Sequence, residues 1–110
     1  MNESMRTVPG DSPIPVFTNQ LEKSREATDV ANVRSAYAEI MTQYLEDGAE
    51  HSMTVTAQQK QDGWQTQPQP GLMTQINGTE AKVTFDAKTS GTYEVAINVT
   101  DAGVVTVTVE

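Results

Sequence analysis

Apolar side chains from Pro15 to Asp47 recur mostly at intervals of three and four residues, which is the period of a helix with one buried face. We therefore predict a helix over about residues 16–47. Its predicted core face consists of Val30, Val33, Tyr37, Ile40, Met41 and Tyr44, with Leu21 at the start of the same stripe. Gly48 directly follows Asp47 and suits a left-handed C-cap, which would end the helix there.

Two starts of this helix fit the sequence. Asn19 is a suitable N-cap, with Glu22 completing a pattern like a capping box, and a start near Val16 fits as well because Pro15 disfavours helix before it. The first turns hold few apolar residues, so we expect them to project past the rest of the domain. The charged residues are predicted to form a solvated outer face or to meet a polar partner: Glu22, Lys23, Arg25, Glu26, Asp29, Arg34 and Glu39.

After Gly48 the pattern changes to strict alternation, which is typical of half-buried strands. Four alternating runs are predicted as strands, at residues 52–57, 83–85, 93–99 and 105–109. Residues 60–63 suit a turn, after which residues 64–66 could pair back as a short strand. Residues 67–77 hold two prolines and are predicted to be a surface loop, and the Asn77–Gly78 pair indicates a turn.

These elements predict an α+β fold, in which one long N-terminal helix packs across a four- to five-stranded antiparallel sheet over about residues 52–110. The connections are short, so neighbouring strands should run antiparallel, and the helix carries the apolar stripe that can cover the sheet. Residues 16–110 are therefore predicted to be a single domain. Residues 1–15 are polar and rich in proline, and we expect a flexible leader there.

The run PVFTNQLEKSREATDVANVRSAYAEIM resembles a segment of type IV pilin-like proteins, especially those of Gram-positive bacteria. In that family this segment joins the lipid-spanning half of the first helix to its soluble half. The resemblance implies a pilin fold and a structural subunit of a type IV pilus or pseudopilus, whose head domain packs into a surface filament. The polar leader lacks the family's apolar helix end and its assembly glutamate, so the resemblance also implies a truncated or replaced terminus.

Partners and location are likewise implied by the resemblance. The partners would be other pilin subunits, in a homopolymer or together with minor pilins, and the membrane, through the missing N-terminal helix. The location would be the cell surface or an extracellular filament, with membrane anchoring before assembly, although the chain as written reads as soluble. Adhesion, motility, DNA uptake and secretion all remain open as the role of such a filament.

Composition narrows the remaining classes of function. The chain has 110 residues and a formal net charge of −8, which disfavours binding to nucleic acid or to anionic lipid, although uptake-type contact with DNA stays open. It contains no cysteine and one histidine, and no nucleophile-elbow or phosphate-loop motif. We therefore expect no enzyme activity, no catalytic residues, no cofactor and no metal. Asp47, Glu50 and His51 are better explained as helix-end chemistry than as a cation site.

A binding module is the alternative to a filament subunit. Such a module would use the loop at residues 58–77 for adhesion or for contact with DNA or a secreted substrate. Trp64 and Gln65 are the candidate contact surface in this loop. The other interpretation of Trp64 is structural, in which its ring caps an open edge of the core. The edge strands, rich in valine and threonine, are a further candidate contact surface.

Overall fold

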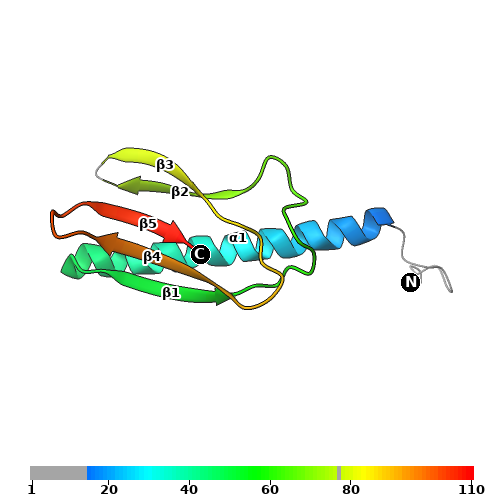
Figure 1. The fold of residues 1–110 in the computed structure, drawn as a ribbon, viewed down its shortest axis with the longest axis horizontal. Coiled ribbons are helices and arrows are strands. Elements are labelled where there is room, and N and C mark those ends of the chain that lie inside the picture. Colours follow the sequence, from blue (N-terminus) through cyan, green and yellow to red (C-terminus); the bar gives the residue numbers. More distant parts are fainter. Residues whose placement is uncertain (1–14, 77) are drawn as a thin grey trace.

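The protein folds as one long helix with antiparallel strands packed along part of it (Figure 1). The computed structural model describes residues 15–76 and 78–110, so the predicted leader lies outside the described residues except for Pro15, which begins the helix. The elements are α1 (Pro15–Asp47), β1 (His51–Thr56), β2 (Gly71–Ile76), β3 (Thr79–Thr84), β4 (Thr92–Val99) and β5 (Val105–Val109). The α+β class and the antiparallel strands are as predicted.

The strands form two sheets, and this corrects the prediction of one four- to five-stranded sheet. The first sheet has the order β1-β4-β5, and the second is the β2–β3 hairpin. Both have antiparallel pairs, with Met53 opposite Val95 and Ile97 opposite Val107 in the first sheet. The hairpin lies beside β5 with no ladder between them (Figure 1).

Two local predictions in the loop region were wrong. Residues 64–66 form no strand, and residues 71–76 form β2 where a loop was expected. Pro68 and Pro70 both precede the first residue of β2, so neither removes a donor from its ladder. The end of the helix is as predicted, because Gly48 has φ of +69° and its N–H donates to Tyr44 O at 2.6 Å.

The core lies between α1 and the first sheet, where β-branched residues of β4 meet one face of the helix. Its buried members are Val30, Val33, Ala36, Ile40, Leu72, Phe85, Tyr93, Val95, Ile97 and Val109. Tyr37, Met41 and Tyr44 are half-buried and pack against this cluster, whereas Leu21 is 43% exposed and lies outside it. No helix among residues 15–76 and 78–110 is long and apolar enough to span a membrane.

Candidate functional site: a loop held on the helix by three carboxylates

Three acidic residues of α1 are buried, which corrects their assignment to the outer face of the helix. Glu22, Glu26 and Asp29 have exposed fractions of 0%, 1% and 0%. Their spacing of four and three residues places them in line with Val33 and Ala36, so they continue the buried stripe of the helix toward its N-terminus. We call these three side chains the carboxylate ladder.

The carboxylate ladder binds main-chain N–H groups of the segment after β1, residues 58–66, which we call the clamped loop. Asp29 accepts from Gln58 N at 2.9 and 3.0 Å, and its Oδ2 accepts from Gln59 N at 3.3 Å. Glu22 accepts from Lys60 N at 3.1 and 3.0 Å and from Gln61 N at 3.1 Å. The loop therefore runs along the helix toward its N-terminus.

Glu26 holds the returning half of the clamped loop. Its Oε2 accepts from Gln65 N at 2.5 Å, and its Oε1 accepts from Thr66 N at 2.9 Å and from the Thr66 hydroxyl at 2.7 Å. Gly63, with φ of +74°, lies in the reversal between the two halves. Because these loop N–H groups have no strand partner, the carboxylates provide the hydrogen bonds that a sheet would otherwise supply.

Charge compensation within the ladder is small. Arg25 Nη1 lies 3.4 Å from Glu22 Oε1, and the Arg25 side chain is 40% exposed. Burial raises the pKa of Asp29 above its ordinary value, and the N–H groups of Gln58 and Gln59 partly oppose this rise. The negative charges of Glu22 and Glu26 raise the pKa of Asp29 further. The ladder therefore keeps carboxylates buried chiefly through hydrogen bonds from the loop main chain.

Trp64 and Gln65, the predicted contact residues, both lie in the clamped loop and are half-buried. Trp64 Nε1 donates to Phe85 O at 2.9 Å, and its ring meets the Phe85 ring edge to face with centroids 5.5 Å apart. Gln65 is tied to Glu26 through its main chain. The indole is thus used to close the core beside Phe85, which is the structural interpretation of Trp64.

Gln59 and Tyr93 connect the clamped loop to the sheet. The Tyr93 hydroxyl donates to Gln59 Oε1 at 3.0 Å and accepts from Lys88 N at 2.8 Å. Both side chains are fully buried, and burial raises the pKa of Tyr93. Gln59 Nε2 is buried without a hydrogen-bond partner among the described residues. One buried hydroxyl therefore bridges the loop, β4 and the segment before it.

Asp47, Glu50 and His51 do not converge on one point. His51 Nε2 lies 2.9 Å from both carboxylate oxygens of Asp47, whereas Glu50 Oε2 accepts from Val99 N at 2.9 Å. The N–H of Ala49 and the hydrogen bond with His51 lower the pKa of Asp47. In the part of the chain that the structure describes, no group of three histidine, cysteine, aspartate or glutamate side chains could hold a metal ion.

Sequence reasoning missed the carboxylate ladder because acidic residues on a helix usually face water. The signal that could have found it is the register: Glu22, Glu26 and Asp29 share the stripe of Val33 and Ile40, at successive steps of four and three. The core face predicted for α1 holds buried Val30, Val33 and Ile40, but it leaves out the three carboxylates that bind the loop.

Comparison with known proteins gives no relative for this chain. No family model, no curated protein and no solved structure matches it.

Proposed function

We propose that this chain is the head domain of a filament subunit of the type IV pilin kind, with assembly rather than catalysis as its function. The observation that carries the proposal is the arrangement of α1, whose first turns extend beyond every described strand and loop (Figure 1). With 33 residues at about 1.5 Å each, α1 is roughly 50 Å long, and the strands lie against its C-terminal part. A helix this long is not needed to cover strands of five to eight residues.

The carboxylate ladder supports the same proposal, because it extends the rigid part of the domain along the helix. Glu22 lies in the third turn of α1, and it already holds the main chain of Lys60 and Gln61. The clamped loop thus joins the helix well beyond the end of the first sheet. A helix that bears load between a filament core and an outer head would need such a connection, because the sheet alone covers only the later turns.

In this proposal the protruding turns of α1 lead toward the filament core, and the sheets form the outer surface. The partners are further subunits, in a homopolymer or with minor pilins, and the location is the cell surface after anchoring in the membrane. Helices in such a core would pack through surfaces that precede Glu22 in the sequence. The net charge of −8 would then be spread over the outer surface and would keep separate filaments apart.

The coding sequence upstream of Pro15 in the source genome tests the proposal. We expect a short basic leader followed by about 20 predominantly apolar residues that run directly into α1. A polar extension, or a separate folded domain joined by a linker, would refute the filament proposal.

A further inference from the structure

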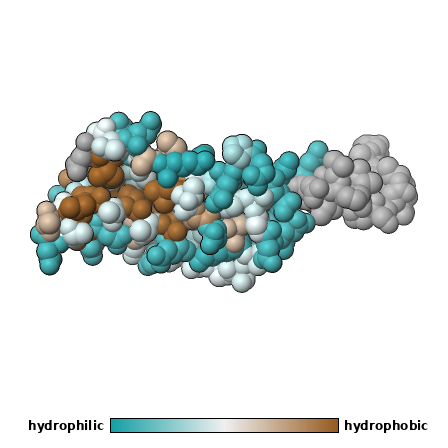
Figure 2. All heavy atoms as spheres, turned by 45° about the horizontal axis from the view of Figure 1, so that its top comes forward, coloured by the Kyte–Doolittle hydropathy of each residue, from teal (hydrophilic) through white to brown (hydrophobic). Residues whose placement is uncertain are grey.

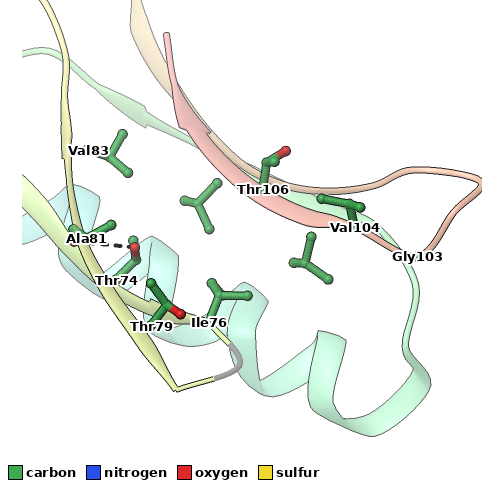
Figure 3. Close-up of a pocket in the computed structure, with 10 residues that line it drawn as sticks. Thr74, Ile76, Thr79, Ala81, Val83, Gly103, Val104 and Thr106 are labelled. Carbon is green, nitrogen blue, oxygen red and sulfur yellow. Dashed lines mark hydrogen bonds between the residues drawn. The ribbon is translucent and has the colours of Figure 1, made fainter.

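We propose that the cleft between β5 and the β2–β3 hairpin is an acceptor site for an extended, uncharged peptide segment, which adds to β5 as a further strand. The cleft encloses about 490 Å³ and is lined by the inner face of the hairpin and by β5 with the turn before it: Thr74, Ile76, Thr79, Ala81, Val83, Gly103, Val104, Val105, Thr106 and Val107. Figure 3 shows these two walls facing each other across an open space.

The main chain of β5 offers an unused row of hydrogen-bonding groups on this side. Glu94 and Glu110 exchange two main-chain hydrogen bonds, of 2.7 and 3.0 Å, and this pair fixes the pattern of the β4–β5 ladder. Because hydrogen-bonded pairs alternate in an antiparallel ladder, the N–H and C=O groups of Val105, Val107 and Val109 turn away from β4. Among the described residues, no ladder joins β5 to β2 or β3.

The hairpin is close to β5 but does not pair with it. Thr74, Ala81 and Val83 belong to the hairpin face that points into the cleft (Figure 3). Some Cα atoms of the hairpin lie within 8 Å of β5, which is less than the roughly 9.6 Å that a strand paired on both sides would need, so an added strand would pair with β5 alone. The cleft opens toward the turn that holds Val104, and this opening is where an added strand would enter (Figure 3).

The side chains that line the cleft indicate the chemistry of the peptide segment that would bind there. None of the lining side chains carries a charge, in a chain whose formal net charge is −8. A charged residue inserted here would find no countercharge, whereas valine, isoleucine or threonine at alternate positions would match both walls. Figure 2 shows apolar residues gathered in a band along this face, and Val104 within the cleft is 55% exposed.

Main-chain pairing would supply affinity and the alternate side chains would supply specificity, as in other cases of strand addition. A single extended segment fits better than the β5 of a second copy. A second copy would bring its own β4 and hairpin behind its β5, and the hairpin of the first copy already occupies that side (Figure 1). The inference does not depend on the proposed filament.

A peptide titration followed by amide NMR tests the proposal. The probe is a capped, uncharged peptide of about seven alternating threonine and valine residues, long enough to span β5. We expect saturable shifts at β5 and at the inner face of the hairpin. Two half-methylated forms of the peptide, with N-methyl groups on opposite sets of alternate amides, should differ at least about tenfold in affinity, because only one set faces β5.

Two protein variants complete the test. Ala81→Lys places a charge on the cleft wall and should weaken peptide binding at least about tenfold, whereas Thr84→Lys, on the opposite face of β3, should change it less than about twofold. Val104→Lys repeats the test from the β5 side if Ala81→Lys does not fold. No shifts, shifts outside the cleft, equal affinity of the two half-methylated peptides or unchanged binding by the cleft variants would each overturn the proposal. Concentration-dependent shifts of β5 without peptide would overturn it in favour of a second copy.

Discussion

Glu26 provides the most direct perturbation of the clamped loop. It is 1% exposed and accepts three hydrogen bonds, from the N–H groups of Gln65 and Thr66 and from the Thr66 hydroxyl. In Glu26→Gln one carboxylate oxygen becomes an NH₂ group that faces a donor, so at least one charge-assisted hydrogen bond is lost. Such a bond contributes about 1.5–3 kcal/mol, and we expect the free energy of unfolding to fall by that amount.

Glu26→Ala removes both acceptor oxygens, and with them all three hydrogen bonds, and should cost more than Glu26→Gln. An unsatisfied buried donor costs about 1–3 kcal/mol. Gln65 and Thr66 are half-buried, so water satisfies part of this need, and we expect a loss of about 3–4 kcal/mol. The relief of one buried charge acts in the opposite direction and keeps the loss near the lower end of the sum.

Urea unfolding followed by tryptophan fluorescence measures this loss, because Trp64 is the single tryptophan and lies in the clamped loop. Glu39→Gln is the matched control: it makes the same change at an exposed position of α1 and should alter stability by no more than about 0.5 kcal/mol. Hydrogen exchange should show loss of protection at the Gln65 and Thr66 amides in Glu26→Gln. If Glu26→Gln behaves like Glu39→Gln and these amides stay protected, the carboxylate does not hold the loop.

Substitutions at three further residues test other parts of the site. Burial raises the pKa of Asp29, so its contribution to stability is full below the ordinary value of 3.8 and is lost as pH rises through the raised folded value. The free energy of unfolding of wild type minus that of Asp29→Asn should therefore decrease as pH rises through that window. A difference that does not change with pH would refute this. Tyr93→Phe leaves Gln59 Oε1 and Lys88 N without their shared partner and should cost about 1–3 kcal/mol in urea unfolding, and an unchanged midpoint would contradict the bridge. Trp64→Ala should lower the free energy of unfolding by about 2–3 kcal/mol in calorimetry, which is below the loss for a fully buried tryptophan. Trp64→Phe should retain part of the contact with Phe85. Equal stability of Trp64→Ala and wild type would show that the ring is free for binding.

The sequence pattern predicted regular elements well where side chains alternate between core and solvent. The predicted helix over residues 16–47 is observed as Pro15–Asp47, and β1, β4 and β5 lie where alternation placed them. Gly48 ended the helix as expected: its N–H closes the last i→i−4 hydrogen bond, to Tyr44 O, and its positive φ turns the chain out of the helix. These features depend on local period and local backbone geometry, which a single sequence carries.

The features that sequence reasoning missed depend on contacts between distant segments. Residues 64–66 look like a strand, but the N–H groups of Gln65 and Thr66 bind Glu26, which is about 40 residues earlier in the chain. The sequence did not predict β2, because the prolines just before it indicated a loop, although the inner face of β2 packs Leu72 into the core. The division into two sheets depends on whether the hairpin pairs with β5, which no alternation pattern encodes.

The filament proposal is tested most directly by imaging native surface filaments from the source organism at a resolution that shows helices. We predict a helical reconstruction in which α1 continues without a break into the filament core, with Glu22 near the point where the helix leaves the core and both sheets outside it. Filaments that lack this chain, or that contain it with α1 ending at Pro15 outside a core made of other subunits, would contradict the proposal.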